Sequence, residues 1–257
     1  MEKETKKLSI LEHLQELRKR LVKCVIAVLI TTIISFVFAK HIFSILILPA
    51  KGINLVYIEM TEMFGTYMTV CLVSGIILAM PFLVYQFLMF VSPGLTRKEK
   101  RYVYLILPWI ALMFTAGVAF GYFILIPPAA KFLISFGSDI ATPQIRISNY
   151  ISIITRLLLA IGLIFEMPVI TTFLSRLGVI TPKWLSNKRK PAIIIAFVLG
   201  AIITPTFDPV NQTLVAAPLI ILYEMSIWLA KLVQRKESRT ALSLPLRRHK
   251  INSTKPY

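Results

Sequence analysis

The sequence predicts an all-α membrane protein whose six membrane-spanning helices form one domain with both termini on the cytoplasmic side. The chain of 257 residues is 56% hydrophobic and only 16% charged, and its mean hydropathy is +0.75, well above that of soluble domains. Long apolar runs recur along it, and lysine and arginine gather in alternate connections between those runs. We therefore attribute the net charge of +17 to membrane topology and not to a nucleic-acid partner.

The first expected element is an amphipathic helix at the cytoplasmic interface, over residues 9–20. Apolar residues recur at helical spacing from Ile10 to Leu21. Glu16 lies on another face of this helix, four residues before Arg20, in the favourable orientation for an intrahelical ion pair. Such a pair is a purely structural explanation of Glu16, and it stays open beside a binding role.

The expected spans follow from runs of about 20 apolar residues, the length that crosses a hydrocarbon core of about 30 Å. Their approximate limits are 21–39, 63–91, 103–126, 150–178, 191–205 and 213–231. The last two runs are shorter than the others, and the fifth reaches only about 22 Å as a helix. We therefore expect the final hairpin to sit shallow or to thin the bilayer. Together these elements make residues 1–237 a single membrane domain.

The distribution of basic residues predicts the orientation. Of the 29 lysines and arginines, 23 lie before or at the start of the first span, in the second-to-third and fourth-to-fifth connections, or from the end of the sixth span onward. Short cytoplasmic loops carry such an excess, so both termini are expected in the cytoplasm. Residues 238–257 form a basic tail that we expect to be disordered and attracted to anionic lipids.

The fourth span contains a charged residue near its midpoint. Glu166 lies ten residues from both Arg156 and Arg176. A carboxylate at the bilayer centre costs about 2.5 to 3.5 kcal/mol, so Glu166 should face protein or water. Pro168 removes a backbone donor and favours a polar notch there. The structural alternative is a glutamate that is hydrogen-bonded to a neighbouring helix.

Chemical signatures of enzymes are absent from the sequence. No phosphate-binding loop, zinc-protease motif or nucleophile elbow occurs. The two cysteines lie inside apolar runs and the three histidines are widely scattered, so we expect no cofactor and no metal site. Gly117 and Gly121 have a spacing that is typical of close helix packing.

Four motifs together resemble the TatC family, the multispanning core subunit of the twin-arginine protein translocase. The similarity extends over about residues 9–237. The motifs are residues 12–21 (EHLQELRKRL), residues 85–95 (YQFLMFVSPGL) with Glu99 after them, residues 165–169 (FEMPV), and Thr204-Pro205 with Asp208 and Gln212.

This resemblance implies a concave, cup-like wall of six spans in the cell inner membrane. It implies a receptor and scaffold that uses the protonmotive force to export folded proteins, as a homo-oligomer and without catalysis. Glu166 would lie inside the concave face. The residues implied to bind the twin-arginine signal peptide are Glu16, Arg18, Phe90, Pro93 and Glu99. Those implied to contact single-span TatA/TatB-type subunits are Thr204, Asp208 and Gln212.

Two other functions are compatible with a polytopic membrane protein. A proton- or ion-coupled secondary transporter could use Glu166, although residues 1–130 and 131–257 lack the convincing repeat that many transporters have. An intramembrane hydrolase would need a catalytic pair, which we do not find.

Overall fold

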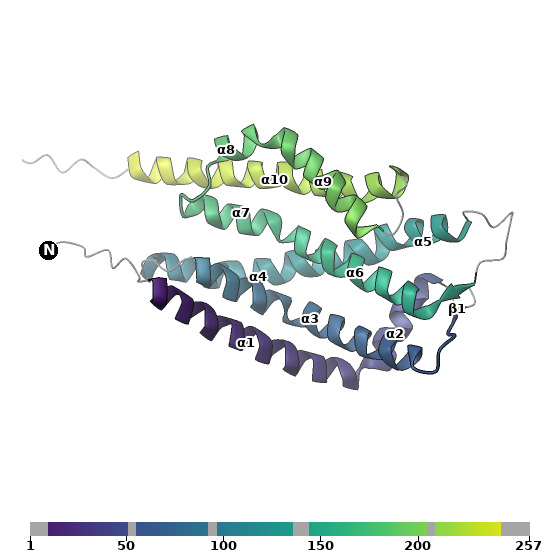
Figure 1. The fold of residues 1–257 in the computed structure, drawn as a ribbon. Coiled ribbons are helices and arrows are strands. Elements are labelled where there is room, and N and C mark those ends of the chain that lie inside the picture. Colours follow the sequence, from purple (N-terminus) through teal and green to yellow (C-terminus); the bar gives the residue numbers. More distant parts are fainter. Residues whose placement is uncertain (1–9, 51–54, 92–96, 136–143, 205–208, 243–257) are drawn as a thin grey trace, which may run out of the picture.

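The computed structural model describes residues 10–50, 55–91, 97–135, 144–204 and 209–242, which are almost entirely helical (Figure 1). The elements in chain order are α1 (Ile10–Val37), α2 (Ala39–Ile47), the short 3-10 helix η1 (Leu48–Ala50), β1 (Leu55–Val56), α3 (Glu62–Val91), α4 (Arg97–Phe120), the π-helical turn η2 (Gly121–Leu125), α5 (Ile126–Ser135), β2 (Ile145–Arg146), α6 (Ile147–Phe165), α7 (Met167–Arg176), α8 (Pro182–Asn187), α9 (Arg189–Ile203) and α10 (Pro209–Leu242).

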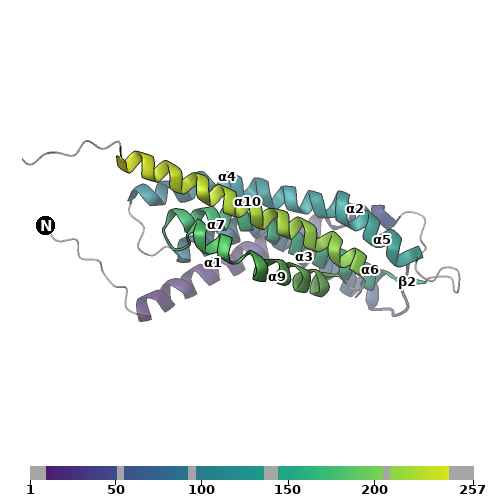
Figure 2. The ribbon, with the colours of Figure 1, turned by 90° about the horizontal axis from the view of Figure 1, so that it is seen from above.

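The long helices lie side by side along one direction. Helix α1 packs on α3, α3 and α4 both pack on α6, and α10 packs on α7 and α9. The start of α1 and the end of α10 lie at the same end of the bundle (Figures 1 and 2). We call this the terminal end, and we call the opposite end, where α2 and the strands lie, the far end.

Within the described residues, five segments are long and apolar enough to cross a membrane, which confirms the predicted class of helical membrane protein. Their limits are Glu12–Val37, Glu62–Val91, Leu105–Phe132, Ile147–Arg176 and Gln212–Gln234. Large apolar side chains are exposed along them, as expected for lipid-facing surfaces. The fifth expected span corresponds to α9, which has only 15 residues. A count of six spans therefore remains a prediction.

The sixth span is longer than the sequence analysis predicts, so the prediction of a short span is wrong. Helix α10 has 34 residues, and a segment of 23 of them is apolar enough to span. Pro209 occupies the first helical position, where its missing N–H removes no hydrogen bond. At the other end the helix continues past the apolar run to Leu242, five residues beyond the boundary expected for the domain. Residues 243–257 of the expected tail lie outside the described residues.

Three other boundaries differ from the sequence-based expectation. The amphipathic segment does not form a separate helix, because α1 runs without a break from Ile10 to Val37 and contains no glycine or proline. The third span continues beyond residue 126 through η2 into α5. The fourth span is interrupted at Glu166, where α6 ends and α7 begins with Pro168 in its first turn.

Glycines set the close approach of α4 to α6. A Cβ atom at Gly117 would lie 2.7 Å from the Cβ atom of Phe165 and 3.1 Å from the Cα atom of Gly162. A Cβ atom at Gly121 would lie 3.2 Å from Leu158. This geometry confirms the packing interpretation of the two glycines.

A parallel pair of two-residue strands joins distant segments at the far end. Leu55 pairs with Ile145, and Val56 pairs with Arg146. Because α3 and α6 begin shortly after these strands, their N-termini lie beside each other.

Candidate functional site

At the terminal end, a polar network joins α1 to α3. Arg20 donates to Oε1 of Glu16 through Nε at 3.0 Å and through Nη2 at 2.5 Å. Its Nη1 atom donates to Oε1 of Gln86 at 3.0 Å. The Glu16 and Arg20 side chains are 28% and 19% exposed, whereas Gln86 is buried. The predicted intrahelical ion pair is therefore present, and it is also anchored on the neighbouring helix.

An aromatic contact lies next to this network. His13 of α1 stacks on Phe90 of α3, with ring centroids 4.5 Å apart and an interplanar angle of 19°. Since His13 precedes Glu16 by about one turn and Phe90 follows Gln86 by about one turn, the stack continues the same helix contact. Arg18 is exposed on α1. The structure thus brings Glu16 and Phe90 to one surface, which we call the terminal patch.

Two predicted residues of this patch are not described. Pro93 lies outside the described residues, and Glu99 belongs to the first turns of α4 but its side chain is not described.

Glu166 lies in the interior at the junction of α6 and α7, and its side chain is fully buried. Its carboxylate lies against the backbone at Phe114 of α4. Neither carboxylate oxygen has a hydrogen-bond partner in the described part of the chain. Glu166 thus faces protein, as expected, but the hydrogen bond to a neighbouring helix that the structural alternative requires is not present there.

Two of the three residues expected to contact partners are described, and they lie on either side of the turn between α9 and α10. Thr204 is buried and donates its hydroxyl to the carbonyl of Gly200 at 2.7 Å. Gln212 donates its side-chain N–H to the carbonyl of Phe197 at 2.9 Å, which clips α10 to α9. Asp208 lies outside the described residues.

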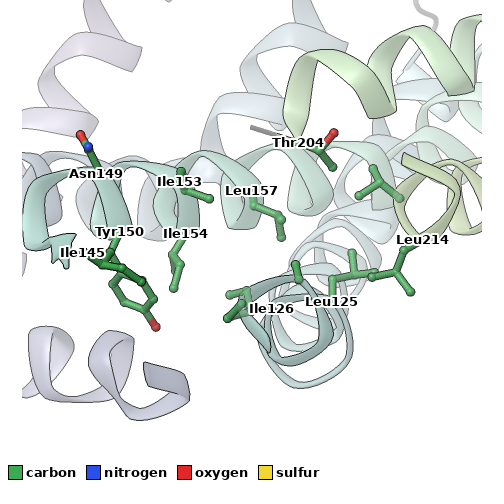
Figure 3. Close-up of a pocket in the computed structure, with 13 residues that line it drawn as sticks. Leu125, Ile126, Ile145, Asn149, Tyr150, Ile153, Ile154, Leu157, Thr204 and Leu214 are labelled. Carbon is green, nitrogen blue, oxygen red and sulfur yellow. The ribbon is translucent and has the colours of Figure 1, made fainter. Parts of the chain in front are cut away.

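Thr204 lines an apolar cavity of about 210 Å³ between this hairpin and α5 and α6. Figure 3 shows Ile153, Ile154 and Leu157 of α6 on one side of it, with Leu214 of α10 on another. A larger cavity of about 710 Å³ lies between η2 and the start of α10, and Leu125 and Leu214 line both cavities. Apolar space therefore surrounds the hairpin near the far end.

At the far end, a buried carboxylate ties α3 to α6. Glu62 accepts hydrogen bonds from the Ser148 hydroxyl at 2.6 Å and from the Ile58 backbone N–H at 2.9 Å. Arg146 donates to Glu59 at 3.2 Å and lies 3.9 Å from Glu62. The Glu62 side chain is 6% exposed and that of Glu59 is 67% exposed. We call this arrangement the far-end clasp.

Sequence reasoning missed the clasp and the role of Gln86. A glutamine inside an otherwise apolar run signals an inward-facing polar contact, and this signal was available at Gln86. No comparable signal identifies Ser148 as the partner of Glu62, because the two residues meet only when α3 and α6 pack.

Comparison with known proteins gives one consistent result. Residues 12–218 match the family of Sec-independent protein translocase proteins, TatC. The chain is 39% identical over 236 residues to the TatC protein of Carboxydothermus hydrogenoformans, which covers 91% of this chain and 97% of that protein. It is 43% identical over 232 residues to the TatC protein of Aquifex aeolicus, with 88% and 96% covered.

The similarity extends to a solved fold. A crystal structure of a twin-arginine translocase receptor, TatC, matches with a TM-score of 0.77 and 43% sequence identity. The match covers 87% of this chain and 100% of that one. The resemblance thus includes the arrangement of the helices as well as the motifs.

Proposed function

Because this chain belongs to the TatC family of Sec-independent protein translocase proteins, we propose that it is the receptor and scaffold of the twin-arginine export system. In this proposal it crosses the cell inner membrane six times, with both termini in the cytoplasm and α9 as the fifth crossing. It binds twin-arginine signal peptides and assembles with single-span TatA/TatB-type subunits. The assembly is a homo-oligomer in which the protonmotive force moves folded proteins.

The observation that carries the proposal is the carboxylate of Glu16 on the terminal patch. It already binds a guanidinium group, that of Arg20, through two N–H donors. Its partial exposure leaves it within reach of an incoming peptide. Arginine presents several donors in a fixed plane and suits carboxylate recognition better than lysine does. A pair of arginines in a signal peptide therefore has a matching acceptor at this surface.

We propose that binding proceeds by exchange at Glu16. An arginine of the peptide replaces Arg20, which keeps its hydrogen bond to Gln86. Exchange of one ion pair for another at a partly exposed site yields little affinity, since such pairs contribute about 0.2 to 1 kcal/mol. Glu99 supplies a second carboxylate in this proposal, and Arg18, Phe90 and Pro93 also take part in binding the peptide. The apolar stretch of the signal peptide, inserted along the helices, supplies most of the binding free energy.

The hairpin of α9 and α10 is the proposed contact for the single-span partners. Thr204, Asp208 and Gln212 supply its polar groups. The two apolar cavities beside it are lined by Leu125 and Leu214 and suit side chains of a transmembrane helix. Helices associate within membranes through van der Waals packing of apolar surfaces and through a few interhelical hydrogen bonds.

A peptide-binding assay tests the receptor role. The full chain in nanodiscs should bind a labelled twin-arginine signal peptide more tightly than its twin-lysine counterpart, measured by fluorescence anisotropy. Glu16→Gln and Glu99→Ala should each weaken binding, whereas Glu59→Gln at the far end is the matched control and should not. Equal affinity for the two peptides in the parent protein would refute the receptor proposal.

The transporter alternative predicts a different result for the same preparation. A secondary transporter that uses Glu166 would take up a small solute into liposomes without partner subunits. Two results together would favour the transporter. The parent protein would take up the solute and Glu166→Gln would not, and the parent protein would bind the two peptides equally.

A further inference from the structure

We propose that a cavity between α7, α8, α9 and α10 near the terminal end binds one acyl chain of an anionic phospholipid, whose phosphate group lies on the lysines at its edge. The cavity measures about 250 Å³. Its lining is almost wholly apolar and includes Met167, Ala192, Ile195 and Leu219. Ile195 is 54% exposed, so the cavity opens on the outer surface of the bundle, which faces lipid in a membrane.

The edge of the cavity is basic. Lys188 lines the cavity itself, and Lys183 and Lys190 are exposed close to it in sequence. Arg189 is already engaged, because its guanidinium donates two hydrogen bonds, at 2.6 and 2.8 Å, to the carboxylate of Glu224. No acidic side chain pairs with the three lysines in the part of the chain that the structure describes. Their charge is therefore available to an anionic headgroup.

The walls of the cavity are held in place without a ligand. The Thr181 hydroxyl accepts a hydrogen bond from the backbone N–H of Trp184 at 3.2 Å and fixes the start of α8. The Tyr223 hydroxyl donates to the carbonyl of Leu185 at 2.9 Å and ties α10 to α8. Preformed walls reduce the entropy that is lost when a flexible chain binds.

Trp184 places the cavity at a membrane interface. It lines the cavity and is 53% exposed. Tryptophan is enriched where the hydrocarbon region meets the headgroups. A phospholipid matches these features. Its acyl chain fits the apolar cavity, and its phosphate lies at the lysines, beside the interfacial tryptophan.

The basic edge of the cavity favours a phospholipid over a partner helix, because a phosphate group supplies the negative charge that an apolar transmembrane helix lacks. With the orientation of the proposed function, this cavity lies in the cytoplasmic leaflet. That placement rests on the proposed function, whereas the site itself does not.

Quenching of Trp184 fluorescence tests the proposal. In a variant with Trp109→Phe and Trp228→Phe, Trp184 is the only tryptophan left in the chain. The full chain is placed in nanodiscs of equal parts phosphatidylglycerol and phosphatidylcholine, with brominated acyl chains on one lipid or the other. We expect brominated phosphatidylglycerol to quench more strongly, with an enrichment of roughly fivefold per lysine in contact.

Three further variants define the outcome. Combined replacement of Lys183, Lys188 and Lys190 by glutamine should make the two lipids quench equally, whereas Lys19→Gln, an exposed lysine of α1, should leave the preference unchanged. Ala192→Phe should fill the cavity and reduce quenching by phosphatidylglycerol. Equal quenching in the parent protein overturns the proposal, and so does a preference that survives in the triple lysine variant. Since no signal peptide takes part, failure here is distinct from failure of the receptor role.

Discussion

Replacement of Glu166 by methionine should stabilise the protein. The Glu166 carboxylate is fully buried, and neither oxygen accepts a hydrogen bond in the described part of the chain. Methionine is unbranched, of similar length and apolar, so it fits the same space without a polar group to satisfy. Glutamine keeps the shape but retains unsatisfied polar atoms.

The expected gain follows from the cost of an unsatisfied buried polar group. Protein mutational data give about 1 to 3 kcal/mol for such a group, so Glu166→Met should raise the free energy of unfolding by about that amount. For a chain of this size the midpoint of thermal unfolding should rise by roughly 2 to 10 °C. Glu166→Gln should give a smaller rise.

Thermal unfolding in detergent is the measurement. Glu224→Met is the matched control, because Glu224 is exposed and paired with Arg189. It should change stability by less than about 1 kcal/mol. A clear loss of stability in Glu166→Met would refute the reasoning, since it would mean that the carboxylate has a partner in the folded state.

Three other predictions concern the helix contacts. Glu62→Ala should lower the unfolding midpoint, because the Ser148 hydroxyl and the Ile58 N–H lose a charged acceptor, whereas Glu59→Ala should have little effect in the same melt; equal losses would contradict the clasp. Arg20→Gln should strengthen binding of the twin-arginine peptide by up to about fivefold in the anisotropy assay, because it removes the internal competitor for Glu16; weaker binding would contradict the exchange. In a thermal melt, Gly117→Ala should lower the free energy of unfolding by about 1 to 3 kcal/mol through overpacking. Gly65→Ala should not, because a Cβ atom there meets nothing within 4 Å. An unchanged stability of Gly117→Ala would contradict the close approach of the helices.

Local features were predictable from the sequence. Apolar runs of spanning length located the first four spans. The motifs identified the TatC family, and the comparisons confirm this family. The ion pair of Glu16 with Arg20 followed from their spacing of four residues on one helix. The packing role of Gly117 followed from its spacing to Gly121. The inferences on spans, ion pair and glycines each depend on residues close together in the sequence, whereas the family follows from four motifs spread along the chain.

Helix limits were less predictable. Hydropathy marks where a helix enters the hydrocarbon region, but the backbone hydrogen bonds of the helix can continue into the polar sequence that lies outside this region. Helix α10 therefore extends beyond its apolar segment, and α1 includes the amphipathic segment that precedes its span.

Sequence alone thus determined the membrane class, the family, the ion pair of Glu16 with Arg20 and the position of Glu166 within an apolar run. Only the tertiary structure decided what the polar side chains contact on neighbouring helices. Arg20 meets Gln86 from 66 residues away, Glu62 meets Ser148 from 86 residues away, and Glu166 meets no hydrogen-bond partner in the described chain. Periodicity and hydropathy act within a single helix, whereas these contacts depend on how each helix is rotated and crossed against its neighbours, which is set by packing over the whole bundle.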